Sequence, residues 1–354
     1  MKYKSPELTG RSIACQTLLF LIIAFLNFSC KGRSSRPDVS GITINTEIKR
    51  FDRDFFSVDT NNIESSIRQL YNKYPNFIPT YFEFFTPVNF IVHQQGKSYS
   101  TAFLQYFRDI KPLYDSVQKK FSNLSSFQNE LNSNLRYVKY YYPSFKTPVV
   151  LTTVESLNPE NAEEIYGALY YRDTLVVSLQ MFMGRNFQVY DPTQYFDYLR
   201  RRFEPQYMVP NCIRSIATAL YTDSSQSASL VEQMIEKGKL WYMMSKFLPD
   251  TPDSLITGYT NRQLHWCREN EGNIWGFITK NTDIYTIDQE TIQNYIGEAP
   301  FTQNMPEVSP GNLGPWVGWQ IINKYVDQHP DLTLQKVLDT PAKTIFQESR
   351  YKPK

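Results

Sequence analysis

The side chains with the most versatile chemistry are few in this 354-residue chain and lie far apart. The three histidines are His93, His265 and His329, and none lies four residues from another, so no helix can present two imidazoles to one zinc ion. No GxSxG, GxxxxGK[ST] or GxGxxG sequence is present. We therefore predict that the protein holds no metal and no cofactor.

Carboxylate pairs are the other candidates for catalysis. Glu232 and Glu236 are four residues apart on a predicted helix, and Glu271 lies further along the chain. Glu236 and Glu271 define one hypothesis, a divergent peptidase-like hydrolase of the cell envelope that uses carboxylates as acid and base. Those roles require burial, which a sequence alone does not reveal. Because Lys239 lies three residues after Glu236, an ordinary surface ion pair is the interpretation we favour.

The first 29 residues have the composition of a bacterial export signal. Three basic side chains within the first eleven positions precede an apolar run over 13–26, which two polar residues interrupt. The run leads to Ser29-Cys30, the small residue before a cysteine that lipoprotein signal peptidases require. We predict cleavage before Cys30, whose thiol then carries a lipid. A membrane-spanning anchor is the alternative, but 13–28 holds only sixteen residues against the ~20 that a bilayer needs.

The basic excess of the chain lies at its amino terminus. The whole chain has 37 basic and 35 acidic side chains, and removal of the signal leaves 34 of each. Lys31, Arg33 and Arg36 lie in the predicted flexible tether 30–39, where each favours anionic lipid headgroups by ~1 kcal/mol. The remaining body is slightly acidic. We therefore predict a membrane partner through the lipid of Cys30, and no nucleic-acid partner.

The elements that must position these residues are mainly helical. From residue 40 to residue 354 no linker, charge block or repeat divides the sequence, which predicts a single domain. Apolar and β-branched runs predict strands, and apolar residues at helical spacing predict helices. The fold class is therefore α+β, predominantly α. The clearest strands are expected near 42–48, 149–154 and 174–179, and the clearest helices over 63–71, 230–242 and 314–328.

Only two cysteines remain in the predicted body, Cys212 and Cys267. An exported pair can form one disulfide, but two buried free thiols fit the sequence equally well, because no spacing rule favours a bridge. Neither CxxC nor the Cys/His spacing of a zinc site is present.

Four separate blocks of the sequence resemble a known family. The blocks cover 48–56 (IKRFDRDFF), 230–242 (LVEQMIEKGKLWY), 258–275 (GYTNRQLHWCRENEGNIW) and 310–325 (PGNLGPWVGWQIINKY). They resemble, in the same order, the GldB gliding-motility lipoproteins of Bacteroidetes. The resemblance implies a lipid-anchored envelope protein with its body in the periplasm, associated with the gliding and type IX secretion apparatus.

A second, fainter resemblance concerns the scaffold. The helix that carries Glu236 and Gly238, followed by a glycine-rich helix start, is similar to a family of zincin-like metallopeptidases. In that family an H-E-x-x-H helix comes first, but here 209–216 reads VPNCIRSI, without histidine or glutamate. The resemblance therefore implies a zincin-like scaffold without its metal, because both imidazole ligands and the general base are missing.

We therefore expect a non-catalytic binding or assembly factor, a pseudoenzyme that contacts envelope proteins of the gliding and secretion machinery. The expected binding groove is taken from the family-like blocks, and its candidate residues are Glu236, Lys239, Trp266, Glu271, Trp316 and Trp319. An aromatic or charged side chain in such a block can equally belong to the core.

Overall fold

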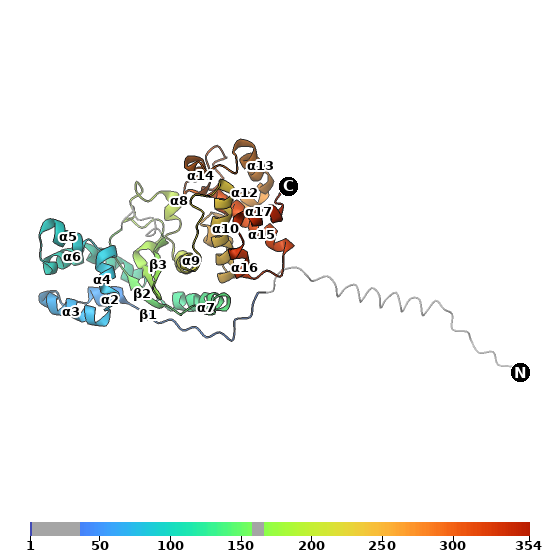
Figure 1. Cartoon of the computed structure of the whole chain (residues 1–354). Helices are drawn as coiled ribbons and strands as arrows, with labels where there is room; N and C mark the ends of the chain where they lie inside the picture. Colours follow the sequence, from blue (N-terminus) through green and yellow to red (C-terminus); the bar gives the residue numbers. More distant parts are fainter. Residues whose placement is uncertain (2–35, 158–165) are drawn as a thin grey trace. The chain divides into compact units, whose positions relative to one another are not determined.

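The computed structural model describes residue 1 and residues 36–157 and 166–354 (Figure 1). The predicted signal and its lipid-carrying Cys30 therefore lie outside the described residues. The structure divides into two units, Met1–Asp38 and Val39–Lys354, and the second contains all of the helices and strands named below.

A small mixed sheet lies in the amino-terminal half of this second unit. Its four strands run in the order β1-β2-β4-β3, with β1 and β4 parallel to β2, and β3 antiparallel to β4. The strands are β1 (Ile48–Lys49), β2 (Val149–Thr153), β3 (Ala168–Tyr171) and β4 (Thr174–Ser178).

The predicted strands near 149 and 174 are confirmed as β2 and β4, whose β-branched side chains are mostly buried. The strand expected over 42–48 is largely wrong, since only Ile48–Lys49 pairs with β2. β3 was not predicted, because its residues are only partly buried and give no alternating pattern.

Helices between β1 and β2 in the chain build an aromatic core. Phe51 packs its ring 4.8 Å from that of Tyr81, and Phe55 lies 5.1 Å from Phe103. Burial of such rings accounts for the high aromatic content of this half. The helices are α2 (Phe51–Phe56), α3 (Ile63–Lys73), α4 (Ile78–Thr80), α5 (Val88–Gln95), α6 (Tyr99–Lys120) and α7 (Ser125–Tyr141), with η1 (Thr60–Asn62) and η2 (Tyr81–Phe85) between them.

A buried carboxylate ties α2 to the sheet and to α6. Asp52 is 1% exposed and accepts hydrogen bonds from Arg50 at 2.7 and 2.9 Å, from Gln118 at 2.6 Å and from Thr152 of β2. A buried charge is stable only when its lone pairs are occupied in this way. The first family-like block thus has a structural role.

The carboxyl-terminal half is helical. The predicted helix over 230–242 is α10, which begins with a capping box between Ser229 and Glu232 and continues to Phe247. The predicted helix after Gly314 is α15. The elements of this half are η4 (Leu179–Phe182), α8 (Asp197–Arg200), η5 (Pro205–Tyr207), α9 (Met208–Leu220), α10 (Leu230–Phe247), α11 (Asp253–Thr257), α12 (Asn261–Glu269), α13 (Glu271–Asn281), α14 (Gln289–Ile296), α15 (Leu313–Gln328), α16 (Leu334–Asp339) and α17 (Ala342–Ser349).

Two glycines let α10 and α15 pack backbone against backbone (Figure 1). A Cβ atom on Gly318 would lie 1.8 Å from the carbonyl oxygen of Met234, and one on Gly238 would lie 2.4 Å from the nitrogen of Trp319. Only a residue without a side chain fits such a contact. Gly238 and the glycines at the start of α15 therefore serve helix packing.

The fold class is confirmed as α+β, predominantly α, because helices far outnumber the four short strands. Among the described residues, no helix combines the length and apolarity needed to cross a bilayer.

Candidate functional site

Glu236 and Lys239 lie one turn apart on α10 and contact each other. Lys239 is 2% exposed, and its ammonium group donates to Glu236 Oε1 at 2.8 Å. It also donates to the carbonyl oxygens of Leu338 and Thr340, at 3.0 and 2.8 Å. The prediction of a surface ion pair is wrong for this lysine, which is buried and supplies donors to carbonyl groups at the carboxyl end of α16. The hydroxyl of Tyr221 donates to the second oxygen of Glu236.

The two tryptophans of α15 lie in the core. Trp316 is 1% and Trp319 is 6% exposed, and the ring of Trp319 lies 6.3 Å from that of Trp241. The indole nitrogen of Trp319 has no hydrogen-bond partner among the described residues. Burial at this level leaves these rings little surface for a ligand, so helix packing accounts for both.

The remaining two candidates lie on other helices. Trp266 is half-buried on α12, and Glu271 is the first residue of α13. Glu271 accepts a 2.8 Å hydrogen bond from the hydroxyl of Tyr351. Of the six predicted residues, the structure pairs Glu236 with Lys239 and gives Glu271 a different partner.

Both cysteines of the body are free and buried. Burial raises the pKa of the Cys212 thiol and of the Cys267 thiol, so neither is an activated nucleophile at neutral pH. Within the described ranges, no three His, Cys, Asp or Glu side chains are grouped as ligands of one metal ion.

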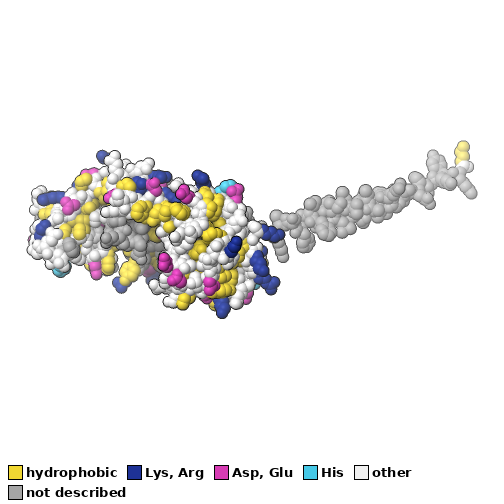
Figure 2. Space-filling model, turned by 90° about the horizontal axis from the view of Figure 1, so that it is seen from above, with side chains coloured by type: hydrophobic (Ala, Val, Ile, Leu, Met, Phe, Trp, Pro, Cys, Tyr) yellow, Lys and Arg dark blue, Asp and Glu magenta, His cyan; other side chains and the backbone are white. Residues whose placement is uncertain are grey.

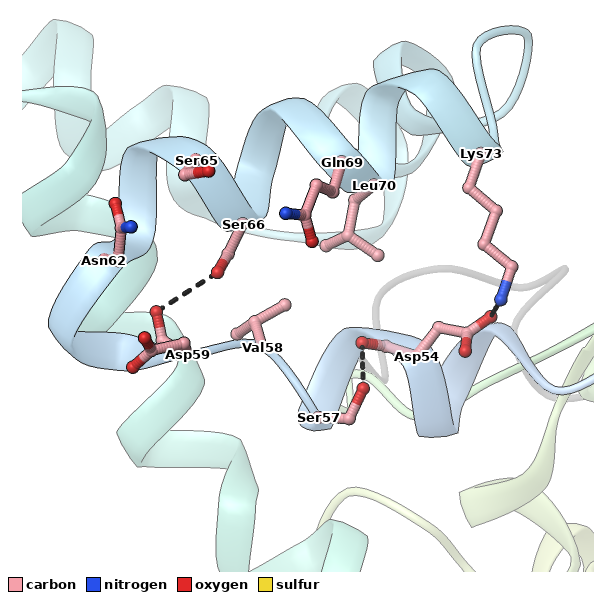
Figure 3. A pocket seen from close by; sticks show the side chains of 10 residues that line it. All are labelled: Asp54, Ser57, Val58, Asp59, Asn62, Ser65, Ser66, Gln69, Leu70 and Lys73. Carbon is pink, nitrogen blue, oxygen red and sulfur yellow. Dashed lines mark hydrogen bonds and ion pairs between the residues drawn. The ribbon is translucent and has the colours of Figure 1, made fainter.

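A polar pocket of about 370 Å³ lies between α2 and α3 (Figure 3). The Lys73 ammonium lies 2.6 Å from Asp54 Oδ2, and the Ser66 hydroxyl donates to the carbonyl oxygen of Asp59 at 3.2 Å. Its one cationic side chain is therefore already neutralised by a carboxylate. None of the six predicted residues lines it.

The sequence analysis missed a cluster of arginines, which we define as Arg201, Arg202 and Arg214. Arg202 forms a two-pronged ion pair with Glu298, with both nitrogen to oxygen distances at 2.9 Å. The Arg202 side chain is 5% exposed and that of Glu298 is 34% exposed. This fork-to-fork geometry is the strongest form of an Arg–carboxylate contact.

The other two arginines of the cluster have neutral partners. Arg201 donates to the Gln263 side chain at 3.0 Å, and Arg214 donates to the carbonyl oxygen of Ile256 at 2.7 Å. Burial and the charge of Arg202 lower the pKa of Arg201 to about 10, and burial lowers the pKa of Arg214. Each guanidinium is thus held in a place that disfavours its charge.

Glu298 is the carboxylate on which the whole arginine cluster acts. Burial alone would raise the pKa of Glu298, but the charges of Arg202, Arg214 and Arg201 outweigh this and lower it. Two of the arginines also share a cation–π contact with one aromatic ring. The ring centroid of Tyr166 lies 4.9 Å from the Arg214 guanidinium carbon and 6.0 Å from that of Arg202.

One sequence signal could have located this cluster, the run of three arginines at 200–202. The run alone would have been misleading, because Arg200 pairs with Asp197 and donates to the carbonyl oxygen of Arg185. On the face shown in Figure 2, basic and acidic side chains are interspersed.

A second missed group is Glu155, which follows β2 and is 2% exposed. Within the part of the chain that the structure describes, neither of its carboxylate oxygens has a well-formed hydrogen bond. Burial raises the pKa of Glu155, and the neighbouring side chains of Ser178, Gln180 and Thr153 offset only part of this rise. Glu155 is therefore a buried acid that favours its neutral form.

The helix compared with the H-E-x-x-H helix of zincins is α9. Its Asn211 donates to the carbonyl oxygen of Tyr166 at 2.7 Å, and its Ser215 hydroxyl accepts from the backbone nitrogen of Tyr170 at 2.7 Å. These side chains hold the segment around β3 in place.

Together these observations define a mainly helical α+β protein. Residues 32–353 match the model of the family described as gliding motility protein GldB, so the chain belongs to the GldB family. The resemblance seen in the four sequence blocks is thereby confirmed. No curated protein and no solved structure matches the chain. The zincin-like resemblance therefore has no support from known structures.

Proposed function

We propose that this GldB-family protein is a lipid-anchored envelope protein that works by binding partner proteins and carries out no catalysis. Its partners are components of the gliding and type IX secretion apparatus, and its body lies in the periplasm. Family membership supports the link to gliding motility. The sequence Ser29-Cys30 after an apolar run supports the lipid anchor.

The proposal that the protein is not catalytic rests on one observation: the two candidate carboxylates, Glu236 and Glu271, have different hydrogen-bond partners. Glu236 accepts from buried Lys239 and from Tyr221, whereas Glu271 accepts from Tyr351 near the carboxyl terminus. An acid and base pair for hydrolysis has to face one substrate from a shared cleft. These contacts favour a structural role for both glutamates.

Crosslinking in intact cells, followed by affinity purification of the tagged protein, tests this role. We expect gliding or secretion components to be recovered with the natural protein. A matched control exports residues 31–354 behind a signal that is cleaved without lipid attachment, so Cys30 is absent but the body is unchanged. This control should leave the membrane fraction and keep its fold by circular dichroism.

Two outcomes would contradict the proposal. If the control without Cys30 remained entirely in the membrane fraction, the lipid would not be the main anchor. If no envelope protein were recovered, and the purified body degraded an envelope peptide or glycan in a manner lost with Glu236→Gln and Glu271→Gln, the hydrolase hypothesis would replace it.

A further inference from the structure

Among the described residues, the arginine cluster has more positive charge than its carboxylate partner balances. Three guanidinium groups act on the single carboxylate of Glu298, which leaves two positive charges in excess. Among the described residues, Arg201 and Arg214 form no ion pair of their own and bind a side-chain amide and a backbone carbonyl. Unbalanced charge in a desolvated place is costly, so such clusters are typical of sites that take up an anion.

The cluster also has N–H donors that no acceptor among the described residues uses. The Nε atoms of Arg201 and Arg202 are buried and have no hydrogen-bond partner among the described residues. Arg201 and Arg214 each use one terminal nitrogen in the contacts described above, so each guanidinium has further N–H groups to offer. Both residues are half-buried, and the Glu298 side chain is 34% exposed, so solvent reaches this part of the cluster.

We propose that Arg201 and Arg214 form a binding site for a phosphate group, with Arg202 and Glu298 as its fixed support. This deepens the binding role proposed above and rests on it. A phosphate monoester carries a charge of about −1.5 to −2 at pH 7 and three acceptor oxygens, which matches the excess of two positive charges. A single carboxylate would neutralise only half of that excess. The Tyr166 ring lies 4.9 Å from the Arg214 guanidinium carbon, and this contact helps to position the guanidinium for two-pronged recognition of phosphate.

Isothermal titration of the purified mature chain, carrying Cys30→Ser, with inorganic phosphate tests the proposal. We expect saturable binding that weakens with added NaCl, and no comparable binding of acetate at equal ionic strength. Arg201→Gln and Arg214→Gln should each weaken phosphate binding about tenfold or more, as expected for loss of a charged hydrogen bond. Arg200→Gln is the matched control, because Arg200 is in the same run but pairs with Asp197, and it should bind as the natural chain does.

The source of the phosphate group is distinguished by a second arm of the experiment. Flotation of the same protein with vesicles of phosphatidylcholine, with and without 20 mol% phosphatidic acid, measures binding to a lipid phosphate headgroup. Co-flotation that depends on phosphatidic acid and is lost in Arg214→Gln identifies a lipid phosphate. Binding of inorganic phosphate without co-flotation identifies a small soluble phosphate compound.

Two results would overturn the proposal. The first is no phosphate binding in either arm, and the second is equal binding of phosphate by the natural chain and by folded Arg201→Gln and Arg214→Gln. Neither result bears on partner recovery by crosslinking, so the proposed function stands or fails separately.

Discussion

Two charge groups of this protein, one around Lys239 and one around Arg202, differ in how their charge is balanced. In the first, Lys239 on α10 has three acceptors, one of which is the carboxylate of Glu236. In the second, Arg202 pairs with the carboxylate of Glu298, and the charges of Arg201 and Arg214 also act on it. The first group lies beside the contact of α10 with α15, where Gly238 and Gly318 leave no room for a side chain. The second lies where solvent reaches its carboxylate.

This difference shows how charged groups that stabilise the fold can be distinguished from charged groups that can bind a ligand. A buried cation whose donors are all used has no capacity left for a ligand, and its removal should damage the fold. A group with surplus charge and spare donors contributes less to the fold and has capacity for a ligand. The predictions below test this contrast, beginning with the largest expected effect.

The close contact of α10 and α15 should be the least tolerant part of the molecule. In Gly318→Ala, the new methyl group would lie 1.8 Å from the Met234 carbonyl oxygen, so the helices have to separate. We expect a loss of about 3 kcal/mol or more in the free energy of unfolding, at or above the upper end for overpacking. Urea denaturation followed by circular dichroism measures it.

Gly276→Ala is the control for Gly318→Ala. Gly276 is exposed within α13, and a Cβ atom there meets nothing within 4 Å. Alanine should therefore stabilise the protein by about 0.5–1 kcal/mol through helix propensity. If both variants lost stability equally, the explanation by close helix contact would be wrong.

Breaking the balanced charge group should have the next largest effect. Lys239→Met leaves Glu236, which is 14% exposed, without its cation and leaves two carbonyl groups without a donor. We expect the free energy of unfolding to fall by about 3 kcal/mol in urea denaturation. The neighbouring Lys237→Met should cost no more than about 1 kcal/mol, because Lys237 is 45% exposed where it pairs with Asp223.

The double variant Glu236→Leu with Lys239→Met adds a finer test. Because it removes both charges, it should recover part of the stability lost in Lys239→Met alone. A double variant that is less stable than the single one would show that Glu236 contributes through other contacts, such as that with Tyr221.

The sequence predicted the elements better than the site. The capping box of α10 and the β-branched strands β2 and β4 are local signals, and the structure confirms these elements. The burial of Lys239 could not be predicted, because its partners Leu338 and Thr340 lie about a hundred residues away and contribute backbone atoms. Backbone acceptors carry no residue-type signal in a sequence.

The arginine cluster was missed for a related reason. Arg202 and Glu298 are 96 residues apart, and Arg214 lies on a different helix from the run at 200–202. The net charge of the whole body does not reveal such a cluster, because the body is slightly acidic. Only the folded chain brings three like charges to one carboxylate.

Substitutions of two carboxylates, Glu298 and Glu155, should change the pH dependence of stability in opposite directions. The folded-state pKa of Glu298 is lowered, so its ionised form stabilises the fold above its unfolded pKa of about 4.3, and this contribution is lost as the pH falls through the folded pKa. Glu298→Gln should therefore be less stable than the natural chain at pH 7, with a difference that shrinks in acid. Urea denaturation between pH 3 and pH 8 follows it.

Glu155→Gln should show the opposite sign in the same series. Burial raises the folded-state pKa of Glu155, so the charged form costs stability, and this cost grows as the pH rises above the unfolded pKa of about 4.3. The variant should therefore gain stability near pH 8 and match the natural chain near pH 3. Equal pH profiles for the Glu155 and Glu298 variants would mean that these two environments do not differ as described.

The smallest expected effect on stability is that of Arg201→Gln, which tests directly whether the charge of Arg201 is surplus. Arg201→Gln removes a cation that Arg202 repels and that no carboxylate pairs among the described residues, so the free energy of unfolding should change by no more than about 0.5 kcal/mol or should rise. Addition of inorganic phosphate should raise the melting temperature of the natural chain, because a ligand of the folded state stabilises it, and should raise that of Arg201→Gln less. A loss of stability as large as that in Lys239→Met would mean that the charge of Arg201 is balanced after all, and the contrast between the two groups would fail.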